Sequence, residues 1–114
     1  MRAEALKGHL DGLLLAVLES GPAHGYAVIE VLRSVSGGTF DLPTGTVYPA
    51  LRRLEEDGLV ASAWDQPPGE RKRRVYQLTA PGRTALATHR QGWQRFSGAV
   101  TAVLAGETSW VPAN

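Results

Sequence analysis

The stretch from Thr44 to Gly58 constrains the fold of this chain more than any other part of the sequence. Val47, Leu51 and Leu54 recur at the i, i+4 and i+7 spacing that places apolar side chains on one face of a helix. Thr44 is of a residue type that caps helix starts, and Gly58 is of the type that ends helices in a left-handed conformation. The pattern therefore predicts one amphipathic helix over these residues.

The other face of this predicted helix carries small residues, hydroxyls, an aromatic ring and an arginine. Hydroxyls near a helix start suit phosphate oxygens, because backbone N–H groups also point outward there, and arginine can reach a guanine edge. We therefore predict DNA-contacting residues at Thr44, Gly45, Thr46, Tyr48, Pro49 and Arg52. The acidic run from Glu55 to Asp57 favours contact through the first half only. The alternative is a solvated amphipathic helix with a packed tyrosine.

Length and composition limit the class of protein. A chain of 114 residues with 43% hydrophobic content is long enough for one domain with a modest core, and this content excludes a disordered chain. The longest apolar run, Leu13 to Leu18, is too short to cross a bilayer, and no secretory signal is visible. Cysteine is absent, which excludes disulfides and thiolate metal sites. We expect a cytoplasmic protein without a membrane segment.

The sequence contains no recognisable catalytic signature. Glycine-rich phosphate loops, the Gly-x-Ser-x-Gly motif and the His-Glu-x-x-His motif do not occur. His9, His24 and His89 lack metal-ligand spacing, and His24 stands where capping or packing of a helix start is expected. We therefore predict no enzyme activity, no cofactor and no metal site.

Two helices are predicted before the stretch described first. Helical spacing of leucines and valines predicts a helix over about residues 4–19, which Gly8 or Gly12 either breaks or weakens. A second helix, over about residues 23–36, is predicted to bury four residues at three-residue steps: Tyr26, Ile29, Leu32 and Val35.

After Gly58 the pattern changes to short strands. Residues 59–64 and 74–78 are predicted strands with four inward side chains: Val60, Trp64, Tyr76 and Leu78. Pro67, Pro68 and Gly69 predict the turn between them. Three helices followed by a β-hairpin indicate a mainly α fold, a winged helix-turn-helix DNA-binding domain over residues 1–80.

Basic residues are concentrated in the second part of the chain. Residues 1–66 contain five Lys and Arg against nine Asp and Glu, whereas residues 67–114 contain seven against two. The densest cluster lies in the predicted hairpin: Arg71, Lys72, Arg73 and Arg74. A local basic patch is typical of proteins that bind duplex DNA, so we predict phosphate contacts there. Two or three of the four are expected to engage, because neighbours in a strand face opposite sides. The alternative is an ordinary solvated turn.

A long final helix is predicted over residues 81–106, with Thr79 as its N-cap and residues 107–114 as a tail. Apolar residues recur there at alternating steps of three and four, the spacing of a coiled-coil seam. A helix of this length overhangs a small core, so the seam is predicted to pair with a second copy of the chain. The predicted dimer interface comprises Leu86, His89, Trp93, Phe96, Val100 and Val103.

Trp93 has two compatible predicted roles, packing of the dimer and stacking on a flat aromatic or hydrophobic effector. The predicted ligand-binding residues are Leu10, Leu14, Trp93 and Phe96.

Several segments together resemble the PadR family of bacterial transcriptional regulators. They are His24-Gly-Tyr26, Thr44-Gly-Thr-Val-Tyr-Pro-Ala-Leu51, Arg53-Leu-Glu-Glu-Asp-Gly-Leu59, the basic hairpin and Tyr76-Gln-Leu-Thr-Ala-Pro-Gly82. The resemblance covers about residues 10–104, and the single final helix is similar to that of the short subfamily.

The resemblance implies a homodimeric winged-helix repressor that binds a palindromic operator in double-stranded DNA. It implies a dimer made by the first and last helices and ligands such as phenolic acids or hydrophobic cationic drugs. Two other functions stay open at this point: a winged-helix module that binds an acidic protein, and a small-molecule-binding dimer without an operator.

Overall fold

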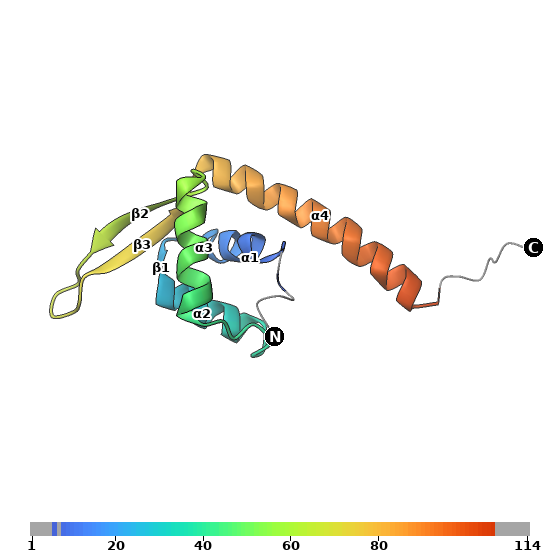
Figure 1. The fold of residues 1–114 in the computed structure, drawn as a ribbon, viewed down its shortest axis with the longest axis horizontal. Helices are drawn as coiled ribbons and strands as arrows, with labels where there is room; N and C mark the ends of the chain where they lie inside the picture. The colour runs from blue at the N-terminus through green and yellow to red at the C-terminus, as the bar shows by residue number, and fades with distance from the viewer. Residues whose placement is uncertain (1–5, 7, 107–114) are drawn as a thin grey trace, which may run out of the picture.

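A computed structural model describes residue 6 and residues 8–106 of the chain. Its elements in chain order are α1 (Leu10–Leu18), β1 (Ala23–His24), α2 (Gly25–Val35), α3 (Thr44–Glu56), β2 (Val60–Asp65), β3 (Arg73–Leu78) and α4 (Ala80–Leu104). The strands form one antiparallel sheet in the order β1-β3-β2. The fold is mainly helical, as predicted, and α4 extends away from the body formed by the other elements (Figure 1).

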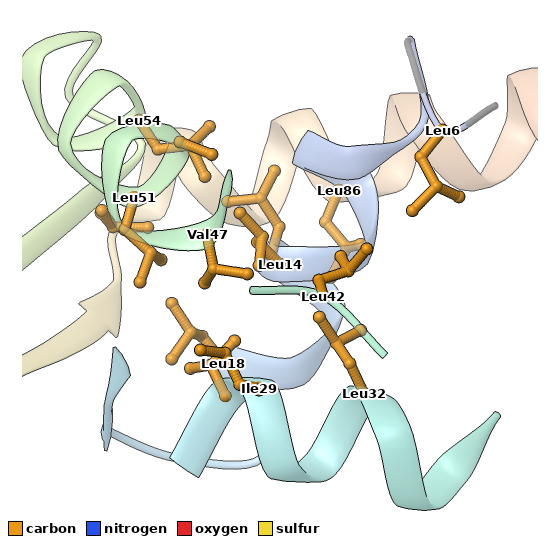
Figure 2. Close-up of a cluster of buried hydrophobic side chains, with 14 residues drawn as sticks. Leu6, Leu14, Leu18, Ile29, Leu32, Leu42, Val47, Leu51, Leu54 and Leu86 are labelled. Carbon is orange, nitrogen blue, oxygen red and sulfur yellow. The ribbon is translucent and has the colours of Figure 1, made fainter. Parts of the chain in front are cut away.

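The hydrophobic core lies where α1, α2 and α3 meet the start of α4. Figure 2 shows their side chains converging, together with Leu42 from the α2–α3 connector and Leu86 from α4. Val47, Leu51 and Leu54 are each 0% exposed, which confirms the predicted buried face of α3.

The first helix is interrupted at Gly8, one of the two glycines at which the pattern allows a break. α1 itself begins at Leu10, later than the predicted start at about residue 4. Gly8 has a φ of 89°, which lies outside the right-handed helical region and separates Leu6 from the helix. Leu6 is nevertheless buried in the core. Residues 4, 5 and 7 of the predicted helix and the predicted tail at 107–114 lie outside the described residues.

The buried face of α2 also differs from the prediction. Tyr26 is 57% exposed and Val35 is 83% exposed, although both were predicted to be inward. A step of three residues turns a helix by only 300°, so a series of such steps drifts off any one face. Ile29 and Leu32, at the middle of the series, are buried as predicted, and Val28 completes the face.

The start of α2 is capped as the sequence predicted. The Nδ1 atom of His24 accepts a hydrogen bond from the Ala27 backbone N–H at 3.2 Å. The same residue lies in β1, which pairs with Tyr76 and Val75 of β3. β1 was not predicted, because a strand of two residues carries no alternating pattern.

The predicted cap is absent at the start of α3 and present at its end. The predicted cap, Thr44, is the first helical residue instead, and Pro43 occupies the N-cap position without a side-chain hydrogen bond. At the other end Gly58 has a φ of 77°, as predicted. The Leu59 N–H donates to the Leu54 carbonyl at 2.9 Å, and the Gly58 N–H donates to the Glu55 carbonyl at 3.0 Å. This is the Schellman arrangement, which turns the chain directly into β2.

The start of α4 is fixed by Thr79 and Gly82. The Thr79 hydroxyl accepts from the Gly82 N–H at 3.1 Å, as expected of an N-cap, and donates to the Gly58 carbonyl at 2.7 Å. A Cβ atom at position 82 would lie only 2.0 Å from the Leu59 carbonyl oxygen. Glycine therefore lets α4 pack directly against the α3–β2 junction.

Candidate nucleic-acid interface

α3 presents a polar face beside the hairpin of β2 and β3, here called the wing (Figure 1). Thr46 is half-buried on this helix. The other predicted DNA-contacting residues of α3 are exposed: Thr44, Gly45, Tyr48, Pro49 and Arg52. Arg52 makes no ion pair among the described residues, so its guanidinium is available to a ligand.

The Tyr48 ring packs on the start of α2. A Cβ atom at position 25 would lie 2.4 Å from Tyr48 Cε1, so only glycine fits under the ring. This contact holds the phenol group at the surface, where Tyr48 is 42% exposed. Two separate sequence motifs, His24-Gly-Tyr26 and the one around Tyr48, thus meet in one contact. Tyr26, which follows Gly25, is a second exposed aromatic at this end of α2, although its spacing predicts an inward side chain.

Pro49 removes one backbone hydrogen bond from the exposed face of α3. Proline has no N–H, so the Gly45 carbonyl lacks its usual partner four residues on. A Cβ atom at position 45 would have nothing within 4 Å. Because Gly45 and Pro49 have small side chains, another molecule can approach the backbone of α3 closely on this face.

α3 is tied to α1 through an ion pair. The Arg53 guanidinium donates to the Asp11 carboxylate, across 42 positions of sequence. The partners are side chains on the surface rather than in the core. Exposed pairs of this kind contribute little to stability, but this one links two elements that lie far apart in the sequence.

Trp64, at the outer part of β2, was predicted to point inward but is 57% exposed. It lies on the same side of the strand as Val60, which is buried as predicted. The outer part of the wing extends past the body (Figure 1), and Trp64 does not belong to the hydrophobic core. Its ring instead has the Lys72 ammonium and the Arg74 guanidinium each 5.1 Å from a ring centroid. Such cation–π contacts stiffen a hairpin that has little core of its own.

The four basic residues of the wing are not equivalent. Arg71 and Lys72 are exposed and have no ion pair among the described residues. Arg73 lies 3.9 Å from Asp65 and 3.8 Å from Glu70.

Arg74 is the second paired cation. Its Nε donates to Ser62 Oγ at 2.7 Å, and its terminal nitrogen is 3.9 Å from Glu55. The sequence could not separate these two paired cations from the two unpaired ones, because the carboxylates come from β2, the turn and α3. The pKa of the neighbouring Tyr76 phenol is raised, mainly by burial and to a smaller extent by the Glu55 carboxylate.

A second surface feature is a pocket between α1 and α4 with a volume of about 430 Å³. Its lining is mainly apolar and includes Leu13, Phe40, His89, Arg90 and Trp93. Trp93 was predicted at such a site. The His9 and Trp93 rings form a T-shaped pair with a centroid distance of 5.4 Å.

Three other residues predicted to bind the ligand are placed differently. Leu14 is 0% exposed within the core, so it cannot contact a ligand in this pocket. Leu10 and Phe96 do not line the pocket either, although the Phe96 ring lies 6.1 Å from that of Trp93. On α1 the pocket is lined by Gly12 and Leu13 instead of Leu10 and Leu14.

The predicted seam residues of α4 fall into two groups. Leu86 is 3% exposed and belongs to the core of its own chain, so it has almost no surface left to offer a partner. His89 is half-buried against α1, where a Cβ atom on Gly12 would lie 3.0 Å from the His89 side chain. The remaining four form an exposed apolar row: Trp93 (53%), Phe96 (58%), Val100 (37%) and Val103 (64%).

The described part of the chain lacks two other kinds of feature. No group of three or more His, Asp or Glu side chains there could hold a metal ion. None of its helices is both long and apolar enough to cross a membrane.

The chain has three helices followed by a two-stranded wing, and the third helix has an exposed polar face. This arrangement defines a winged helix-turn-helix domain, a class that places a helix in a DNA groove. The chain belongs to the PadR-like family of transcriptional regulators, whose family model matches residues 14–88. Members of this family are DNA-binding regulators, not enzymes.

Solved structures support the assignment over nearly the whole chain. A PadR family regulator from Eggerthella lenta DSM 2243 is 32% identical, with a TM-score of 0.76 over 90% of this chain and 88% of that one. A PadR-like regulator from Bacillus cereus strain ATCC 14579 is 26% identical, with a TM-score of 0.79 over 91% and 99% of the two chains.

Two curated relatives are matched over only part of their own length. The transcriptional regulator Rv3488 of Mycobacterium tuberculosis is 45% identical over 53 residues, which are 46% of this chain and 49% of the relative. The chain thus spans about half of that protein, and it spans 24% of a 37.1 kDa Streptomyces fradiae protein to which it is 39% identical.

Proposed function

We propose that the protein is a homodimeric repressor that binds a palindromic operator and releases it in response to a small effector. Two copies of α3 enter successive major grooves, about one helical turn of DNA apart. The observation that carries the proposal is the polar, unpaired face of α3 around Arg52, supported on a rigid body of the PadR type. As a regulator of prokaryotic genes, the protein acts in the cytoplasm.

The proposed DNA contacts divide by chemistry. The hydroxyls of Thr44, Thr46 and Tyr48 bind phosphates, and the low surface at Gly45 and Pro49 admits the helix deep into the groove. Arg52 binds a guanine edge or a phosphate. On the wing, the unpaired cations Arg71 and Lys72 bind flanking phosphates.

The proposed dimer uses the exposed row on α4, from Trp93 to Val103. An effector that is aromatic or hydrophobic occupies the pocket between α1 and α4, beside Trp93. Because α1 also contacts α3 through Asp11 and Arg53, a shift of α1 changes the spacing of the two recognition helices. Operator binding then weakens because the half-sites no longer match.

The DNA-binding part of the proposal is tested with Arg52→Ala on the promoters of the protein's own and neighbouring genes. Loss of one base or phosphate contact is expected to weaken operator binding by about 1–3 kcal/mol, measured by footprinting and fluorescence anisotropy. Arg83→Ala is the matched control, since Arg83 is an exposed cation on α4, and it is expected to leave affinity unchanged.

Two other results would favour the alternative functions. Wild-type protein without any promoter footprint, but with affinity for acidic peptides, would indicate a protein-interaction module. Tight binding of aromatic ligands without a footprint would indicate a small-molecule-binding dimer. Ligand quenching of tryptophan fluorescence, compared with Trp93→Phe, separates the pocket signal from that of Trp64.

A further inference from the structure

One basic residue of the wing, Arg74, makes several polar contacts within its own chain although it is partly exposed. Arg74 Nε donates to Ser62 Oγ at 2.7 Å, and Ser62 Oγ donates in turn to Glu55 Oε2 at 2.5 Å. A terminal nitrogen of Arg74 lies 3.9 Å from the same Glu55 oxygen. The guanidinium also lies 5.1 Å from the centroid of the Trp64 ring. These side chains join β3 to β2 and both to α3.

This chain of contacts sits where the wing leaves the body. β2 starts four residues after the end of α3, and the two strands then extend away from the helix (Figure 1). An isolated two-stranded hairpin has little stability of its own in water. Its direction relative to α3 therefore depends on the contacts near its base, which include the pairing of β3 with β1 and the side-chain contacts of Glu55, Ser62 and Arg74.

We propose that Arg74 is a positioning residue, which sets the angle between the wing and α3, and that it does not bind a phosphate. The inference rests on the proposed function, because the angle matters for a protein that places α3 and the wing on one DNA duplex. Glu55 acts in the same set, so an acidic residue near the DNA surface has a positive role. Arg71, exposed and without an ion pair among the described residues, is the contrasting phosphate contact.

The direction in which Glu55→Gln changes DNA affinity distinguishes the two possible roles of Arg74. If Arg74 bound a phosphate, Glu55→Gln would remove a competing carboxylate and a repulsive charge, and DNA affinity would rise. If Arg74 positions the wing, Glu55→Gln breaks the chain of contacts, and DNA affinity falls.

The experiment measures operator affinity at four or more salt concentrations for Glu55→Gln, Arg74→Gln, the double variant and Arg71→Gln. Glu55→Gln and Arg74→Gln are each expected to lower operator affinity roughly three- to tenfold. The double variant is expected to lose no more than either single variant, because both substitutions break the same network. Their plots of log affinity against log salt keep the wild-type slope. Arg71→Gln is expected to reduce that slope by about 0.9, the value of one phosphate contact on duplex DNA.

Three results would overturn the proposal: a slope reduced by Arg74→Gln as much as by Arg71→Gln, a rise in affinity with Glu55→Gln, or additive losses in the double variant. Circular dichroism checks that the variants fold. Ser62→Ala, which deletes only the bridging hydroxyl, provides a milder break in the same network, with a smaller loss expected in the same direction.

Hydrogen exchange on the DNA-free protein tests the positioning role independently of any operator. Arg74→Gln and Glu55→Gln are expected to speed amide exchange in β2 and β3 and to leave α1 and α2 unchanged, whereas Arg71→Gln changes neither. If the wild-type protein bound no promoter, the proposed function would fail while exchange still decided the role of Arg74. Unchanged exchange in the wing would refute that role.

Discussion

The two halves of α4 are one continuous helix, but only the first is buried against the body of its own chain. In the proximal half, residues 80–89, Gly82 and Leu86 are buried against the body. In the distal half, residues 90–104, Trp93, Phe96 and Val103 are each more than half exposed. An exposed apolar row of this kind is typical of a surface that meets another molecule.

The difference follows from length. A helix rises about 1.5 Å per residue, so the 25 residues of α4 run well past a body made of helices of 9 to 13 residues. The proximal half is part of a domain core, and the distal half has the properties of half an interface. The proposed dimer explains why the apolar pattern continues after the core has ended.

Replacement of Gly82 by alanine tests the anchoring of the proximal half and has the largest expected effect. The added Cβ would lie 2.0 Å from the Leu59 carbonyl oxygen, a backbone atom that cannot rotate away. We expect the free energy of unfolding to fall by about 3 kcal/mol, the upper part of the usual range for overpacking. Urea denaturation followed by circular dichroism measures this loss.

Gly98→Ala is the matched control in the distal half. A Cβ there would have nothing within 4 Å, so the better helix propensity of alanine is expected to add up to about 1 kcal/mol. Losses of similar size at both glycines would contradict the contrast between the two halves.

The double substitution Phe96→Asp and Val103→Asp tests the distal half. The two residues are seven positions apart, on the same face of the helix. Two charges placed in an apolar interface are expected to raise the dimer dissociation constant by about 100-fold, roughly 2.7 kcal/mol, while each chain keeps its fold. Sedimentation velocity over a range of protein concentrations measures the change.

Gln94→Asp with Thr101→Asp provides the control for charge and helix propensity. This pair has the same seven-residue spacing but lies off the apolar row, and both side chains are exposed. The control variant should stay associated. Equal dissociation of the two double variants would mean that the apolar row is not the contact surface.

Leu86 and Trp93 illustrate what the sequence could and could not predict. Periodicity predicted α4, its Thr79 cap and one apolar face that carries both residues, and the structure confirms the helix and the cap. Periodicity tells which face a residue lies on, not how far the body extends beneath that face. Leu86 was therefore grouped with the interface, although it is buried in its own chain.

The same reason explains Trp64. Alternation correctly placed it on the side of Val60, but the wing extends past the body and leaves the ring exposed. Ion pairs were still harder to predict from the sequence. Glu55 and Arg74 are 19 positions apart, and their link depends on how α3 and the wing pack. Local patterns predicted elements and basic clusters well, whereas the pairing within a cluster needed the tertiary structure.

Gly12→Ala tests the boundary between the two halves, where α1 packs on His89. The added Cβ would lie 3.0 Å from His89 Cβ, closer than ordinary contact, so α1 and α4 must separate slightly. We expect a fall of about 1 kcal/mol in the free energy of unfolding, a modest overpacking penalty. Gly45→Ala in α3, with nothing within 4 Å, is the control and should not destabilise the protein. A stabilised Gly12→Ala variant would show that the boundary is looser than the distances indicate.

The smallest expected effect concerns Arg90, the first residue of the distal half, which binds Glu19 with two hydrogen bonds of 2.8 and 2.9 Å. The hydrogen bond from Arg90 holds the pKa of Glu19 below its ordinary value. A carboxylate whose pKa is lower in the folded state stabilises the fold above its unfolded pKa, and the contribution disappears as the pH falls through the folded pKa. The melting temperature of Glu19→Gln should therefore lie slightly below that of the wild type at pH 7, and the difference should vanish at low pH. Because both side chains are exposed, the difference should also shrink in high salt. A difference in melting temperature that persists at acidic pH would mean that Glu19 supports α4 through packing rather than through charge. The part of α4 that is packed against the body would then extend past His89.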